Sequence, residues 1–183
     1  PLYLKIWLED ELSFLGECPW EEDLSHARAV CEALGLELQI VSLQKEYKER
    51  IISYTIEEIK AGRTPNPDML CNTFIKFGAF LENHGHGFDR VATGHYAGLV
   101  EREGRYFLKL TPDPVKDQTY FLARLSQQQL ARTLFPLCDV TKEQVRAHAH
   151  RFNLPNKEAY FSTAYQMGLK GIFDQSVKTS LQS

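Results

Sequence analysis

Two residues that could carry out chemistry lie close together in the stretch AGRTPNPDMLCN, residues 61–72. Asp68 and Cys71 are three positions apart, which is about one turn if the segment is helical. Pro65 and Pro67 disfavour helix before them, and Pro67 suits the first turn of a helix. A helix N-terminus lowers a thiol's pKa, and the thiolate is the reactive form. The spacing leaves two interpretations open: a nucleophile with its base, or a helix start with a favourable first-turn acid and a buried thiol.

A second candidate site is ATGHY, residues 92–96, at the end of a short predicted strand. Open α/β sheets bind ligands at the carboxyl ends of parallel strands. Gly94 would let a nucleotide approach the backbone closely. His95 is compatible with a base, with a ring that stacks on a nucleobase, or with a structural histidine.

A third candidate is the loop KDQTYFL, residues 116–122. Lysine suits phosphate groups and glutamine can read base edges, so the loop could contact nucleic acid. A solvated loop is the alternative interpretation. The HGHG at residues 84–87 has no further ligand near it in sequence, and we expect a loop there and no metal site.

The elements that must position these residues alternate between strand and helix. The apolar patterns predict strands at residues 2–8, 37–43 and 90–96, and helices at 25–35, 45–60 and 68–83. The first helix would bury Cys31 as a core residue and end at Gly35. The third would place Leu70, Phe74, Phe77 and Leu81 on one face. This alternation predicts a parallel sheet covered on both faces.

A different pattern follows Tyr96. Residues 97–110 predict two antiparallel strands joined around Glu103 and Gly104. Two capping-box signatures predict two further helices, Ser126 with Gln129 and Thr141 with Gln144.

The composition is that of an ordinary globular protein, with 183 residues, 43% hydrophobic and 25% charged. No apolar run approaches the roughly 18 to 20 residues that a membrane-spanning helix needs. The net charge of −3 gives no global electrostatic case for nucleic-acid binding. Any such contact would use a local patch, for which the chain offers Lys60, Arg63, Lys76, Lys109, Lys116 and Arg124. The cysteines lack a C-x-x-C pairing, which favours reduced thiols: Cys18, Cys31, Cys71 and Cys138.

Taken together, several ordered segments resemble the tRNA-specific 2-thiouridylases, the MnmA family: AGRTPNPDMLCN, FIKFGAFL, ATGHY and KDQTYFLARLSQQQL. The resemblance covers residues 3–156. The segment KIWLEDELSFLGECPWEEDL, residues 5–24, resembles the plastid and cyanobacterial type of the family. The resemblance thus implies an intracellular protein of a plastid or mitochondrion, with the cytoplasm as the alternative.

The resemblance implies an α/β fold, Rossmann-like and of the ATP-pyrophosphatase type. Its parallel sheet would lack the first strand and be followed by a β-hairpin and a small α-helical region. Residues 1–125 would form a partial nucleotide-binding domain, residues 126–157 a helical region that contacts tRNA, and residues 158–183 a divergent tail.

In that family, ATP adenylates O2 of the wobble uridine of tRNA, and a persulfide sulfur then displaces AMP to give 2-thiouridine. The implied cofactor is ATP with Mg²⁺, and the implied partners are tRNA and a persulfide sulfur donor protein, with no membrane. Cys71 matches the nucleophile, and Asp68 an acid or base beside it. The remaining matches are Asn66, Pro67 and Asp68 at the target base, Leu4 and Gly94 at the ATP site, and Lys116, Asp117 and Gln118 at tRNA.

Two departures from the family pattern lead us to expect a chain that is incomplete for sulfur transfer. The family's glycine-rich SGGVDS phosphate loop would precede residue 1. Its second cysteine would follow Asn156, where this chain reads KEAYFSTAYQMGLKGIF. The alternative function is therefore a non-catalytic remnant that binds tRNA or a protein. Another enzyme of the same superfamily, such as a synthetase, is not expected to carry NPDMLCN.

Overall fold

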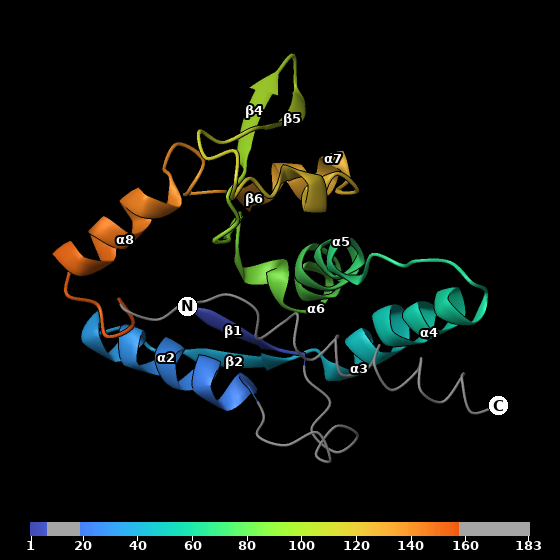
Figure 1. Ribbon diagram of the computed structural model, residues 1–183, viewed down its shortest axis with the longest axis horizontal. Helices are drawn as coiled ribbons and strands as arrows, with labels where there is room; N and C mark the ends of the chain where they lie inside the picture. Colours follow the sequence, from blue (N-terminus) through green and yellow to red (C-terminus); the bar gives the residue numbers. More distant parts are fainter. Residues whose placement is uncertain (7–18, 158–183) are drawn as a thin grey trace. The chain divides into compact units, whose positions relative to one another are not determined.

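The computed structural model describes residues 1–6 and 19–157 (Figure 1). Predictions that concern residues 7–18, Cys18 among them, and the tail from residue 158 onward lie outside the described residues. The described residues form two compact units: 1–3, 19–40 and 149–157 make one, and 4–6 and 41–148 make the other. Every candidate site residue belongs to the second unit.

The first unit contains α2 (Pro19–Ala33), which ends in a Schellman motif. Leu36 N donates to Cys31 O at 2.8 Å, and Gly35 N donates to Glu32 O at 3.0 Å. Gly35 has a φ of 64°, in the left-handed region that favours glycine. The predicted helix end at Gly35 is therefore confirmed, and so is the burial of Cys31 as a core residue.

Two strands, β1 (Leu2–Lys5) and β2 (Gln39–Ser42), form a two-stranded sheet. Gln39 N donates to Pro1 O at 3.1 Å and Leu43 N donates to Lys5 O at 2.8 Å. Both partners advance by four residues in the same direction, so the strands run parallel. A strand, a helix and a parallel strand are the unit that the alternating pattern predicted.

The second unit is built on two long helical stretches, each with a π-helical middle. The first consists of α3 (Gln44–Tyr47), η2 (Lys48–Ile52) and α4 (Ser53–Lys60). The second consists of α5 (Pro67–Cys71), η3 (Asn72–Ala79), α6 (Phe80–His84) and the 3₁₀ turn η4 (Gly85–Gly87). The helices predicted at 45–60 and 68–83 are thus confirmed, and the second begins one residue earlier, at Pro67.

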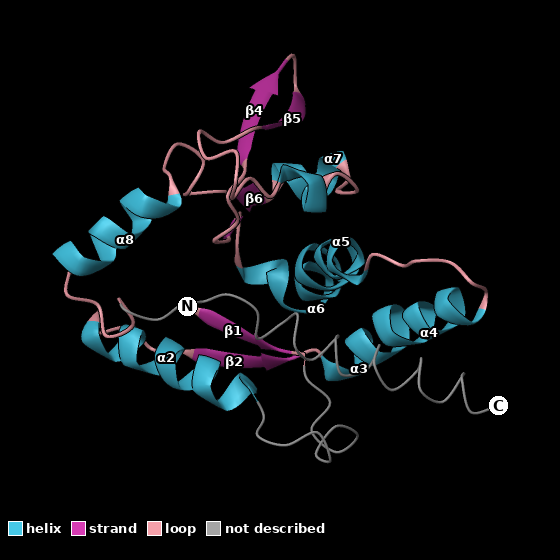
Figure 2. Cartoon of the chain, viewed as in Figure 1, coloured by secondary structure: helices cyan, strands magenta, loops and turns pink. Residues whose placement is uncertain are grey.

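Two further strand pairs follow (Figure 2). The strands β3 (Val91–Ala92) and β6 (Thr133–Leu134) pair parallel, and β4 (Gly98–Arg102) and β5 (Arg105–Lys109) form an antiparallel hairpin. Glu103 and Gly104 have φ of 52° and 70°, and a two-residue hairpin turn of type I′ needs positive φ at both positions. The predicted hairpin is confirmed. A strand as short as β6 has too few residues for a sequence period.

The last described elements are η5 (Thr119–Leu122), α7 (Gln127–Ala131) and α8 (Lys142–Arg151). Both capping boxes are confirmed, because each Gln side chain bonds back to the cap residue's N–H: Gln129 to Ser126 at 2.9 Å and Gln144 to Thr141 at 2.8 Å. Parallel strand pairs among helices confirm the α/β class. None of the helices in the described part of the chain has the length and apolar character needed to cross a membrane.

The second unit's core is apolar and centres on the two helical stretches. Its fully buried side chains include Leu43, Ile51, Ile75, Phe77, Phe80 and Leu122. The prediction that Phe74 shares a face with Leu70, Phe77 and Leu81 is wrong, because Phe74 is 37% exposed and the other three are buried. A π-helix closes its hydrogen bonds five residues on, so the 3.6-residue period loses phase across η3.

Candidate active site

The segment NPDMLC begins a helix, as its prolines predict. Asn66 is the N-cap of α5, and its Oδ1 accepts a hydrogen bond from Met69 N at 3.1 Å. Pro67 occupies the first turn and is buried. Because a cap and a proline both act within the first turn, the backbone around Asp68 is fixed locally.

Asp68 has the electrostatic surroundings expected of an acid or base. It is half-buried, and this burial raises the pKa of its carboxyl above the usual 3.8, while the Lys76 ammonium acts in the opposite direction. A carboxyl whose pKa lies closer to pH 7 exchanges protons more readily at physiological pH. Asp68 therefore combines a raised pKa with a position one turn from Cys71.

Cys71 lies inside the protein, with only 1% of its surface exposed. Its helix, α5, packs against η2 and η5. The described cysteines are all thiols: Cys31, Cys71 and Cys138. Because the Cys71 side chain is covered, its neighbours must move before the sulfur reaches a substrate atom.

The loop at residues 116–122 is joined to the helix of Cys71. Asn72, the next residue after Cys71, donates from Nδ2 to Phe121 O at 3.1 Å. Asn72 is 3% exposed, and its Oδ1 has no hydrogen-bond partner. Phe121 N in turn donates to Gln118 O at 3.0 Å. Two hydrogen bonds therefore separate Gln118 from the residue after Cys71.

The same loop is joined to the segment ATGHY. Gln118 N donates to Tyr96 O at 2.8 Å, and Tyr96 N donates to Gln118 Oε1 at 2.9 Å. The three candidate segments are thus linked in series: ATGHY to the loop, and the loop to the Cys71 helix. Sequence spacing could not predict this, because the partners are 22 and 49 residues apart.

Asp117 organises the loop internally. Its carboxylate accepts hydrogen bonds from the backbone N–H and the hydroxyl of both Thr111 and Thr119. Burial alone would raise the pKa of Asp117, but these hydrogen bonds outweigh it and lower the pKa below 3.8. Lys116, by contrast, is exposed.

His95 has the environment of a structural residue. Its Nδ1 lies 2.9 Å from Thr93 Oγ1, and its ring lies 6.0 Å from that of Phe77 and 6.2 Å from that of Phe135. Burial, with the Lys76 ammonium adding to it, lowers the pKa of His95 to about 3. The imidazole is therefore neutral at physiological pH, which favours the structural interpretation among the three.

The two residues predicted for the ATP site both lie at strands. Leu4 is half-buried in β1, and Gly94 is exposed just after β3. No atom lies within 4 Å of the position a Cβ would take at Gly94. The backbone there is open to the close approach that a nucleotide would need.

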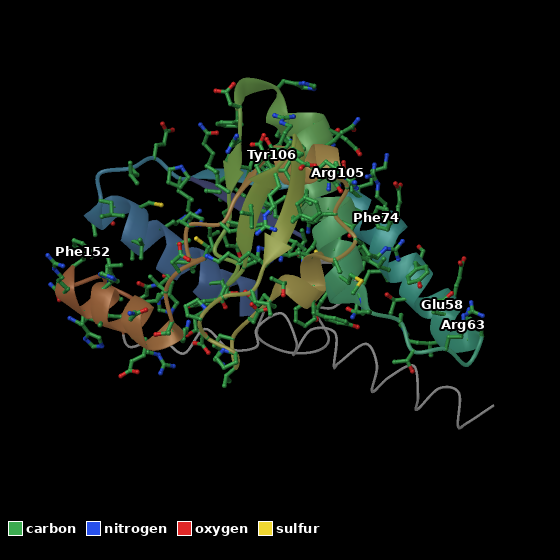
Figure 3. All side chains as sticks on the ribbon, turned by 90° about the horizontal axis from the view of Figure 1, so that it is seen from above. Glu58, Arg63, Phe74, Arg105, Tyr106 and Phe152 are labelled. Carbon is green, nitrogen blue, oxygen red and sulfur yellow. The ribbon has the colours of Figure 1, made fainter. Side chains whose placement is uncertain are left out.

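The six cations considered for a local patch have different environments. Arg63 pairs with Glu58 at 2.5 Å at the end of α4 (Figure 3), and Lys109 pairs with Asp139 at 2.9 Å. These two charges are compensated locally. Arg124 lies over the exposed Phe74 ring, with its Cζ 5.8 Å from the ring centroid.

Among the residues that the structure describes, no three His, Cys, Asp or Glu side chains form a group that could hold a metal ion.

Fold and site together define a class: an α/β domain with a buried cysteine one turn into a helix that starts at a proline. A family profile described as "tRNA methyl transferase HUP domain" matches residues 1–164, and the chain belongs to this family. The α/β, Rossmann-like fold implied by the motifs is thereby confirmed.

Three relatives of the chain carry the name tRNA-specific 2-thiouridylase MnmA. The chain is similar to that of Parabacteroides distasonis, 45% identical over 154 residues, which are 84% of this chain and 43% of the relative. It is also similar to those of Akkermansia muciniphila, 47% identical over 84% of this chain and 43% of the relative, and Methylobacillus flagellatus, 47% identical over 88% and 45%. The resemblance inferred from the motifs is confirmed. The chain spans less than half the length of these relatives.

Proposed function

We propose that this chain is the nucleophile-bearing part of a sulfurtransferase that forms 2-thiouridine at the wobble position of tRNA in an ATP-dependent reaction. The observation that carries the proposal is the position of Asp68 and Cys71 one turn apart on a helix that starts at Pro67, in a chain similar to tRNA-specific 2-thiouridylases. The sequence relation supports the reaction class, and the helix start at Pro67 supports the residues that the family resemblance implies.

Cys71 is the proposed nucleophile and Asp68 the proposed acid or base. A thiol attacks as thiolate, so it must first lose its proton. Asp68, whose pKa is raised by burial, is proposed to exchange protons next to the target uridine. Asn66 and Pro67 are proposed to contact the target base, since they precede Asp68 on the same fixed turn.

ATP with Mg²⁺ is the proposed cofactor. The open space at Gly94 fits a bound nucleotide, and Gly94 and Leu4 are the residues proposed to contact it. ATP would activate the uridine oxygen by converting it into a leaving group. Mg²⁺ would be held through the nucleotide's phosphates, as is usual for this ion.

The proposed macromolecular partners are tRNA and a persulfide sulfur donor protein. Lys116, Asp117 and Gln118 form the proposed tRNA loop. The exposed Lys116 suits a phosphate, whereas Asp117 would act by holding the loop in shape. A plastid or mitochondrion is the proposed location, on the resemblance of residues 5–24.

A second candidate function, a non-catalytic remnant that binds tRNA or a protein, is favoured by one specific observation. The sequence KEAYFSTAYQMGLKGIF, residues 157–173, contains no cysteine where the family has its second one. Residues 157–173 therefore offer no thiol that could carry the persulfide sulfur.

A chimera separates the two candidates. This chain would replace the matching segment of the Parabacteroides distasonis relative, and the chimera would be given ATP, Mg²⁺, a persulfide donor and unmodified tRNA. The enzyme proposal predicts tRNA-dependent release of AMP together with 2-thiouridine, detected by mass spectrometry of nucleosides. A second chimera that keeps the relative's own residues beyond Asn156 is the control for the missing cysteine. If both chimeras bind tRNA but release no AMP, the remnant interpretation stands.

A further inference from the structure

The helix that carries Cys71 changes its hydrogen-bond pattern immediately after that residue. Cys71 ends α5, and the π-helical segment η3 begins at Asn72. π-helical turns are rare, and an unbroken α-helix would otherwise be expected here. Some contact must therefore stabilise the π turn against the α-helical alternative.

Gly78 makes the π turn possible. A Cβ at Gly78 would lie 2.8 Å from Thr73 O, which is closer than real Cβ atoms come to a backbone oxygen. The two residues are five apart, which is the spacing of a π-helical hydrogen bond. The close approach of this carbonyl to residue 78 is therefore tolerated because residue 78 is glycine.

Gln129, from α7, stabilises the same turn from outside. Its Nε2 donates to Thr73 O at 2.8 Å and to Phe77 O at 2.9 Å, so both hydrogens of the amide are directed at carbonyls of η3. Its Oε1 accepts from Ser126 N at 2.9 Å, within the capping box of α7. The amide orientation is thus fixed by three hydrogen bonds.

Loss of the two donated bonds would favour a return of η3 toward α-helical hydrogen bonding. Each residue turns by about 100° in an α-helix, so a change of one residue in register would rotate Cys71 relative to the elements packed on it. The direction of the Cys71 side chain therefore depends on whether the π turn is maintained.

We propose that Gln129 is a positioning residue for Cys71: its side-chain amide maintains the π turn that follows the nucleophile and thereby sets the direction of the thiol. The inference rests on the proposed function only in that it takes Cys71 to be the nucleophile. The positioning of the thiol can be measured without any sulfur transfer.

Gln127 provides a matched control on the same helix. Its Nε2 donates to Tyr106 O at 2.8 Å and its Oε1 accepts from Tyr106 N at 2.8 Å, so it also makes two hydrogen bonds to the backbone of another element. That element is β5, which does not contain Cys71. Ser126→Ala serves as a second control, because it removes the cap hydroxyl and leaves the Gln129 amide in place.

The experiment measures the alkylation rate of each cysteine in this chain with iodoacetamide, by peptide mass spectrometry. Gln129→Ala is expected to raise the rate at Cys71 about tenfold, the equivalent of one to two lost neutral hydrogen bonds. Gln129→Glu, which keeps the size but replaces the donor, is expected to do the same. Cys31 is the internal reference, since it is buried and belongs to the other unit.

The outcomes are distinct. A rise at Cys71 alone, absent in Gln127→Ala and Ser126→Ala, supports the proposal. It is overturned if Cys71 reacts as in the parent chain, or if Cys31 rises in parallel. In the chimera, Gln129→Ala is expected to lower kcat for 2-thiouridine formation about tenfold with KM for tRNA unchanged, the pattern of a lost transition-state interaction. A chimera without any sulfur transfer contradicts the proposed function, whereas the alkylation result still decides the role of Gln129.

Discussion

At the scale of single residues, burial shifts the pKa of two titratable groups in the candidate segments, Asp68 and His95. Asp68 and His95 both have pKa values moved in the direction that favours their neutral form, because removal from water disfavours charge. The Lys76 ammonium acts on both groups, opposing burial at Asp68 and reinforcing it at His95. The Lys76 ammonium thus favours the ionised form of Asp68 and the neutral form of His95.

Replacement of Asp68 by Asn is expected to raise the melting temperature at pH 7. The folded-state pKa of Asp68 lies above its ordinary 3.8, so the ionised form costs stability at neutral pH, and the cost disappears as the pH falls through the raised pKa toward 3.8. Thermal unfolding at pH 7 and pH 4 checks this, and the gain should shrink at the lower pH. Asp113→Asn is the control of opposite sign, because a hydrogen bond from Lys142 N lowers the pKa of Asp113. A gain that is equal at both pH values would contradict the burial effect.

His95 is expected to make the protein sensitive to acid. Its pKa falls from 6.5 to about 3 on folding, so the unfolded chain binds a proton between these values and stability is lost as the pH drops below 6.5. His95→Phe does not show this loss. Relative to the parent chain, its free energy of unfolding should therefore rise by about 1.4 kcal/mol for each pH unit below 6.5. Urea unfolding of both proteins at pH 7, 6 and 5 measures the difference. Parallel stability curves would show that His95 titrates normally.

At the scale of elements, the nucleophile helix is shaped by one glycine and one distant amide. Gly78→Ala is expected to destabilise the protein by about 1 to 3 kcal/mol, because its Cβ would be forced against a backbone carbonyl that has little room to move. Gly87→Ala is the matched control, since no atom lies within 4 Å of its Cβ position. Denaturant titration of both variants gives the comparison, and equal stabilities would contradict the close packing of η3.

Some features of these elements could be predicted from the sequence and others could not. Helix starts were predictable because Pro67, Ser126 and Thr141 act on backbone groups within about four residues. The hairpin was predictable because a two-residue turn at Glu103 and Gly104 leaves few conformations. The π turn was not, since its support comes from Gln129, 52 and 56 residues from the carbonyls it binds. A sequence period cannot register contacts of that range.

Part of the candidate site was likewise predictable from the sequence. Asp68 and Cys71 were found from their spacing and the loop at residues 116–122 from its residue types, and the family resemblance added Asn66, Pro67 and Leu4. Their linkage was not predictable, because it passes through Asn72, which reads as an ordinary helix residue. The buried, unpartnered Oδ1 of Asn72 could be seen only in the folded chain.

At the scale of the whole molecule, net charge limits how this chain could bind RNA. A net charge of −3 provides no general attraction for RNA, so any affinity must come from local contacts. The chain spans 43 to 45% of the length of the relatives described above, so a full-length relative contains further residues that this chain does not match. The chain is therefore best tested within a full-length relative.

The salt dependence of tRNA binding is expected to identify Lys116 as a phosphate contact. In the chimera, Lys116→Ala should weaken binding and reduce the slope of log affinity against log salt by about one. Lys109→Ala is the control, because Asp139 already neutralises that ammonium at 2.9 Å. Filter binding across a salt series provides the slopes. An unchanged slope for Lys116→Ala would remove this residue from the proposed tRNA loop.

The most direct test of the central claim is 2-thiouridine formation by the chimera with Cys71 replaced by Ser. The substitution keeps the size of a side chain that is 1% exposed, so folding and tRNA binding should be preserved. If Cys71 is the nucleophile, the variant will bind tRNA as the unsubstituted chimera does and form no detectable 2-thiouridine. Thiolation at an undiminished rate by Cys71→Ser would contradict the assignment of this chain as the nucleophile-bearing part of a tRNA sulfurtransferase.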